Sequence, residues 1–210
     1  EMTFEPVPWF VAVFISVTII RLYLAYRRRL SAPLLYLSVA VDMGLLLGMI
    51  WSFHLQYQQP PPFYLKSPTL LYVFIFIALR ALRFEARYVI AAGVIAAVGW
   101  AAIALYAAQA SGEINVITRD YVTYLKSNVV LIGAESEKIT IILTVTVIIA
   151  AAITRARSLL IKSVAEGAAA HDLSRFFSPE IARQIITAEQ EVTAGTGKAR
   201  DAAILMVDIR

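Results

Sequence analysis

The chain has no cysteine, few charged residues and only two histidines. Without cysteine there can be no disulfide, thiolate metal site or thiol redox chemistry. Charged residues make up 16% of the 210 residues, whereas hydrophobic residues make up 60%. Soluble domains are about 45–50% apolar, so this excess predicts a helical membrane protein. No basic segment precedes the first apolar run, so that run is not a signal peptide.

Apolar residues are gathered into five stretches that approach the ~20 residues a helix needs to cross a bilayer. Pro8, Pro33 and Pro68 begin three of these stretches, and proline is tolerated in the first turn of a helix. We therefore predict an all-α helical membrane bundle over residues 1–154. Its predicted spans are 8–26, 33–53, 68–84, 88–108 and 136–154.

Basic residues predict how the bundle is oriented. One set of flanks holds nine of them and the alternate set holds three, which is a positive-inside signal. The N-terminus is then outside, and everything after Thr154 is cytoplasmic. Because five spans and an outside N-terminus suggest a sixth helix upstream, we expect the chain to be a fragment. The nine are Arg27, Arg28, Arg29, Arg80, Arg83, Arg87, Arg155, Arg157 and Lys162, and the three are Lys66, Arg119 and Lys126.

The two outer connections differ in composition. Residues 54–67 contain three consecutive prolines, which predict a stiff extended connector. Residues 116–131 are rich in Val, Ile, Thr and Tyr, which favours a short hairpin or a lid over the bundle. A solvated connector and a sensing surface are both open interpretations of this longer loop.

Three ionisable residues, Arg21, Asp42 and Arg80, lie inside apolar runs. Each costs at least ~2.5–3.5 kcal/mol in hydrocarbon, so each needs a partner or water. At 1.5 Å per residue all three fall roughly 6–13 Å from the cytoplasmic side, so they can meet there. We predict either an intramembrane polar switch or ligand pocket centred on Asp42, or a structural ion pair with the arginines reaching toward the interface.

The fifth span continues without a breaker into a predicted cytoplasmic transducer helix over residues 155–178. Its apolar seam is weak, especially near Gly167, so we expect either a parallel pairing that can rotate or a solvated linker. Ser178 and Pro179 then start a short helix. A buried strand over residues 202–209 delivers Asp208 to its end, which is a common way to hold a divalent cation.

The segment Phe176-Phe-Ser-Pro-Glu-Ile-Ala-Arg, followed after a gap by Ala-Ile-Leu-Met-Val-Asp208-Ile209-Arg210, resembles the entry to bacterial class III adenylate/guanylate cyclases. The resemblance implies that residues 179–210 begin an α/β cyclase domain. It also implies that Asp208 and the Ile209 carbonyl bind one of two Mg or Mn ions, which assist cyclisation of ATP to cyclic AMP. The resemblance implies that the family's remaining catalytic residues lie downstream of Arg210, so we expect this chain alone to be catalytically incomplete.

The resemblance further implies a homodimer in the bacterial inner membrane, with the bundle as a receptor or regulatory domain. Its partners would be membrane lipid, ATP in the complete enzyme and an unidentified membrane or extracytoplasmic ligand, with no nucleic acid. The alternatives are a passive dimerising anchor of the same cyclase and a small transporter or channel. No haem is expected, because bis-histidine ligation needs paired histidines and His54 and His171 fall on opposite sides of the membrane.

Overall fold

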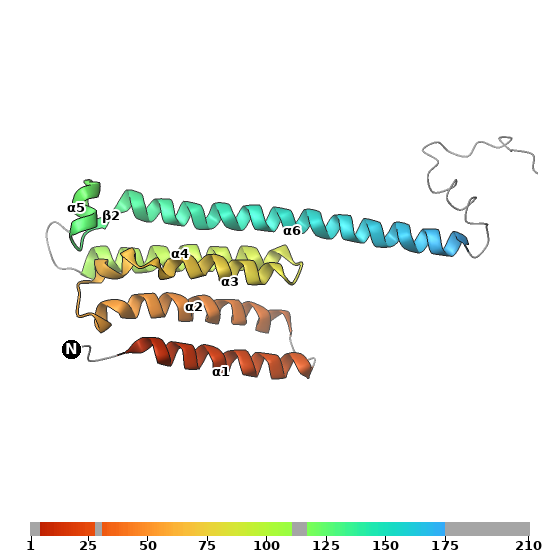
Figure 1. The fold of residues 1–210 in the computed structure, drawn as a ribbon, viewed down its shortest axis with the longest axis horizontal. Coiled ribbons are helices and arrows are strands. Elements are labelled where there is room, and N and C mark those ends of the chain that lie inside the picture. The colour runs from red at the N-terminus through yellow and green to blue at the C-terminus, as the bar shows by residue number, and fades with distance from the viewer. Residues whose placement is uncertain (1–4, 28–30, 111–116, 175–210) are drawn as a thin grey trace, which may run out of the picture. The chain divides into compact units, whose positions relative to one another are not determined.

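The computed structural model describes residues 5–27, 31–110 and 117–174 (Figure 1). The chain divides into two compact units, Glu1–Arg157 and Ser158–Arg210. Within the described residues the structure is mostly helical, and four helices are long and apolar enough to cross a membrane. The four are α1 (Pro6–Tyr26), α2 (Ala32–Gln56), α4 (Ala86–Ala110) and α6 (Ile132–Ser174).

The third predicted span is shorter than we expected. It begins with a 3₁₀ helix, η2 (Pro68–Leu71), and continues as α3 (Tyr72–Ala81). The Ser67 side chain caps the start by accepting a hydrogen bond from the Thr69 amide. After Ala81 the chain reverses through a turn in which Phe84 has a φ of 54°, so the apolar run to residue 84 is not helical throughout.

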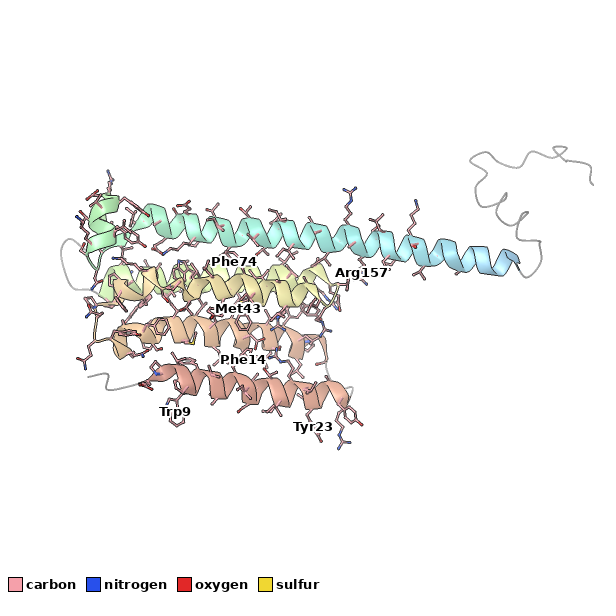
Figure 2. The ribbon with its side chains drawn as sticks, in the orientation of Figure 1. Trp9, Phe14, Tyr23, Met43, Phe74 and Arg157 are labelled. Carbon is pink, nitrogen blue, oxygen red and sulfur yellow. The ribbon has the colours of Figure 1, made fainter. Side chains whose placement is uncertain are left out.

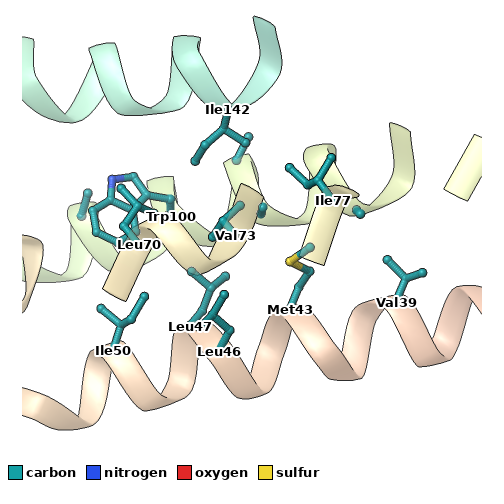
Figure 3. Close-up of a cluster of buried hydrophobic side chains, with 14 of the residues drawn as sticks. Val39, Met43, Leu46, Leu47, Ile50, Leu70, Val73, Ile77, Trp100 and Ile142 are labelled. Atoms are coloured by element: carbon teal, nitrogen blue, oxygen red, sulfur yellow. The ribbon is translucent and has the colours of Figure 1, made fainter. Parts of the chain in front are cut away.

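The core of the first unit lies where α2, α3 and α4 pack together, with α1 against α2 (Figure 1). Met43 of α2, Ile77 of α3 and Trp100 of α4 are fully buried and point into the shared interior (Figure 3). By contrast, Trp9 and Tyr23 of α1 point away from the bundle and are largely exposed (Figure 2). Such apolar exposure is what lipid contact requires, because hydrocarbon solvates these side chains.

Small residues on α4 let α6 approach closely. Ala92, Gly93 and Ala96 are buried on one face of α4. A Cβ on Gly93 would lie 2.0 Å from Oγ1 of Thr146 on α6, closer than any real contact. Close backbone approach at small residues is the usual way that apolar helices pack in membranes.

The two connections that we predict to lie outside differ in structure from the predictions. Residues 61–66, expected to be extended, form a 3₁₀ helix, η1 (Pro61–Lys66), because each proline has a φ that also suits a tight helical turn. The longer connection is not a hairpin. Strands β1 (Ile117–Thr118) and β2 (Val130–Leu131) pair in parallel around the short helix α5 (Tyr121–Lys126), which the Asp120 carboxylate caps.

Helix α6 is continuous over 43 residues, about twice the length that crossing a bilayer requires. The boundary predicted between a span ending at 154 and a stalk starting at 155 is therefore not a break in the backbone. Asp208 and Ile209 lie outside the described residues, as do Ser178 and Pro179. No α/β catalytic domain is present within the described ranges.

We expect Gly93→Ala to destabilise the bundle, because the new methyl group would overlap Thr146 and force α4 and α6 apart. The loss should be about 1–3 kcal/mol, measured as a lower melting temperature of the purified chain in detergent. Gly44→Ala is the matched control, since a Cβ at that position meets nothing within 4 Å. Equal melting temperatures for the two variants would contradict the proposed close packing.

Candidate functional site

The candidate site is the group that we name the Asp42 cluster, made of Arg21, Ser38, Asp42 and Arg80. It joins three helices, since Arg21 comes from α1, Ser38 and Asp42 from α2, and Arg80 from α3. The carboxylate of Asp42 is only 1% exposed. The structure thus brings together the three ionisable residues that the sequence places at similar depth.

Arg21 binds Asp42 through two parallel hydrogen bonds. Its Nη1 donates to Oδ2 over 2.7 Å and its Nη2 donates to Oδ1 over 3.0 Å. Nη1 also donates to the Ser38 hydroxyl over 2.7 Å. This two-point geometry is specific to arginine, because a lysine ammonium cannot present two coplanar N–H groups to one carboxylate.

Arg80 approaches the same carboxylate from α3, and its Nη2 donates to Asp42 Oδ2. The cluster therefore holds two guanidinium groups for one carboxylate, with a formal charge of +1. Arg80 Nε is also buried and has no hydrogen-bond partner among the described residues. An excess positive charge in a poorly solvated place favours binding of an anion or a change in packing that brings a second anion near.

A cavity of about 400 Å³ adjoins the cluster, and Asp42 forms part of its wall. The rest of the lining is almost wholly apolar and comes from α1, α2 and the η2–α3 segment. Phe14 and Phe76 contact each other edge to face with ring centroids 5.5 Å apart. Figure 2 shows Phe14 directed from α1 toward the bundle. This arrangement can hold an apolar ligand.

A second polar group, which the sequence reasoning did not identify, lies at the other end of the helices. We name it the outer cluster, after the side of the membrane on which the sequence predicts it to lie. Its members are Lys66, Trp100, Tyr124, Glu135 and Lys138. Glu135, only 4% exposed, accepts hydrogen bonds from Trp100 Nε1 over 3.0 Å and from Lys138 Nζ over 2.8 Å. The one signal in the sequence was the spacing of Glu135 and Lys138, three residues apart at the start of a helix.

The outer cluster fastens the short helix α5 to the bundle. Tyr124 donates to Glu135 over 3.4 Å, and Lys66 Nζ lies 5.0 Å from the centre of the Tyr124 ring. Lys66 also donates to the Ser127 carbonyl over 2.5 Å, while Lys138 donates to the Leu65 carbonyl over 2.6 Å. Contacts from α5 therefore reach the first turns of α6 directly.

Burial, followed by the charge of Glu135, raises the pKa of Tyr124 to about 12. Burial also lowers the pKa of Lys66 from its ordinary value. Both shifts have the sign expected where the charged form of a group is poorly solvated. Within the described part of the chain no group of three or more acidic or histidine side chains could hold a metal ion.

We expect Asp42→Asn to lower the free energy of unfolding by about 3–5 kcal/mol, because two partly buried guanidinium groups lose the carboxylate that they share. The measurement is the thermal melting of the purified chain in detergent. Glu85→Gln is the matched control, since its partner Arg87 is 55% exposed and such pairs contribute only about 0–1 kcal/mol. A smaller loss for Asp42→Asn than for Glu85→Gln would contradict this account of the cluster.

We also expect an alkaline transition from Tyr124. Because its pKa is raised above the ordinary value of 10.0, the stability that it contributes is complete below pH 10 and is lost as the pH rises toward 12. The difference in tyrosinate absorbance between the wild-type chain and Tyr124→Phe should titrate near pH 12. Glu135→Gln should move that titration to lower pH, and a midpoint near 10 in the wild-type chain would contradict the burial.

Comparison with protein-family models, with curated proteins and with solved structures found no match for this chain.

Proposed function

We propose that the chain is the membrane anchor and receptor domain of a nucleotide cyclase that converts ATP to cyclic AMP in the bacterial inner membrane. The observation that carries this proposal is the continuity of α6 from Ile132 to Ser174. This helix begins beside the outer cluster, includes an apolar stretch long enough to cross a membrane, and ends just before the residues that resemble the cyclase entry. A helix without a break can carry a rotation or shift along its whole length, which a flexible linker cannot do.

The proposed signal enters α6 through its contacts in the bundle. The outer cluster joins its first turns to α4 and α5, and Thr146 packs against Gly93 farther along. A ligand would act only if it bound two arrangements of these contacts with different affinity. The Asp42 cluster could be a second point of rearrangement, since one carboxylate is shared by two arginines from different helices.

The proposed catalytic role of the C-terminal residues depends only on their resemblance to class III cyclases. Asp208 and the carbonyl of Ile209 would each provide an oxygen ligand to a divalent ion, and Mg or Mn suits such oxygen ligands. The shared active site of the family forms between two catalytic domains, so the complete enzyme would be a homodimer. Exposed apolar side chains on α6, among them Leu160 and Val164, offer a surface for pairing two such helices.

We expect cyclase output of the full-length enzyme to depend on the rotational phase of α6. Inserting one alanine after Lys162 turns everything beyond it by about 100°, because an α-helix has 3.6 residues per turn. We expect basal output to change several-fold, and a seven-residue insertion at the same place to restore it, because seven residues return the seam of a paired helix to its register. The measurement is cyclic AMP formation in membranes that contain equal amounts of enzyme. Equal output from the parent enzyme and both insertion variants would contradict coupling through α6.

A separate experiment distinguishes a receptor from a passive dimerising anchor. Residues 1–154 of the full-length enzyme are replaced by an unrelated dimeric membrane anchor joined in the same helical phase. We expect the chimera to keep basal cyclase activity and to lose any response to membrane extracts. If the chimera responds as the parent does, the bundle is a passive anchor.

A further inference from the structure

Two cavities on the same side of the bundle share part of their walls. The first is the apolar cavity of about 400 Å³ beside the Asp42 cluster, and the second has a volume of about 380 Å³. Phe53 and Thr69 line both of them. The two cavities therefore adjoin, and we name them together the α1–α3 groove.

The groove is amphipathic along its length. Its apolar part is walled by side chains such as Phe10, Met49 and Phe76, from α1, α2 and α3. Its polar part includes Lys66, Ser67 and Thr69, from the η1–η2 segment. A positive charge and two hydroxyl groups thus stand at one end, and the apolar part extends from there toward Asp42.

The volume of the apolar part limits what can occupy it. Small-molecule pockets commonly enclose roughly 300–1,000 Å³, and 400 Å³ falls in this range. Two turns of an α-helix about 10 Å across occupy roughly 800 Å³, which is about twice this volume. A single hydrocarbon chain is slender enough, and apolar walls would solvate it without any polar group left unpaired.

The positive charge of Lys66 favours a negatively charged head group on such a molecule. Lys66 lines the second cavity, and its Nζ has three N–H donors, of which one is used on the Ser127 carbonyl. Among the described residues that line either cavity, Asp42 is the one carboxylate, and two arginines already bind it. An anionic head at Lys66 meets complementary charge, whereas a cationic head would meet repulsion there.

We propose that the α1–α3 groove binds a single-chain anionic lipid of the fatty-acid class, with its carboxylate at Lys66 and its hydrocarbon chain between α1, α2 and α3. Binding itself does not depend on the proposed cyclase function. Its consequence does, because Lys66 contacts Tyr124 and Ser127, and Tyr124 in turn contacts Glu135 of α6. A bound carboxylate would compete for Lys66 and so alter how α5 is held on α6.

The direct test is equilibrium binding of radiolabelled palmitate to the purified chain in nanodiscs of neutral phospholipid. We expect saturable binding that unlabelled palmitate displaces and that hexadecanol, with the same chain and no charge, displaces at least about tenfold less well. Acetate, which has the head without the chain, should not displace it. Binding that hexadecanol displaces as well as palmitate would overturn the role of Lys66.

Variants test the two ends of the groove separately. Lys66→Gln should weaken palmitate binding about tenfold or more, and Lys66→Arg should retain it, because the arginine keeps the charge. Lys126→Gln is the matched control, an exposed lysine outside the groove. Met49→Trp should abolish binding by filling the apolar part, whereas Val98→Trp, on an exposed face of α4, should leave it unchanged. Unchanged affinity in Met49→Trp would overturn the proposed position of the hydrocarbon chain.

The two proposals can fail independently. If palmitate binds as described but leaves cyclic AMP formation by the full-length enzyme unchanged, the lipid site stands and its proposed effect on the cyclase is wrong. If palmitate shows no saturable binding while the anchor replacement removes a response to membrane extracts, the receptor function stands and the lipid site is wrong.

Discussion

The bidentate ion pair between Arg21 and Asp42 is the interaction on which the position of α1 depends. Of the residues of α1, only Pro6 is buried in the structure, so this helix contributes very little to the apolar core. In a bilayer, apolar side chains gain nothing from leaving lipid for protein, so helix association rests on close packing and polar contacts. Arg21 supplies the polar contact, and Asp42 passes it on to α3 through Arg80.

The same interaction sets the depth and the lining of the α1–α3 groove. Asp42 lines the groove at one end. Phe14 and Phe76 also line it, and their rings contact each other. If the ion pair opened, α1 could move on α2 with little loss of buried apolar area. The proposed lipid site and the proposed switch therefore share one structural basis, which is a helix held mainly by charge.

The outer cluster attaches α6 to neighbouring helices through polar contacts, as the Asp42 cluster attaches α1. Glu135 and Lys138 join the beginning of α6 to Trp100 of α4 and to Tyr124 of α5. Neither cluster includes a residue of the other, and α4 and α2 form the packed core between them. A signal from the groove would reach the beginning of α6 through Lys66 and its contacts with α5.

The sequence by itself determined that the chain is helical and apolar enough to cross a membrane, because runs of apolar residues are a local property of the chain. It also determined that Arg21, Asp42 and Arg80 needed partners, because the cost of a charge in hydrocarbon does not depend on the fold. The length of α3, the parallel pairing of β1 with β2 and the outer cluster were decided only by tertiary structure. The outer cluster depends on residues far apart in the chain, since Trp100 donates to Glu135 and Lys66 to Ser127, and no local pattern encodes which distant partner a side chain will meet.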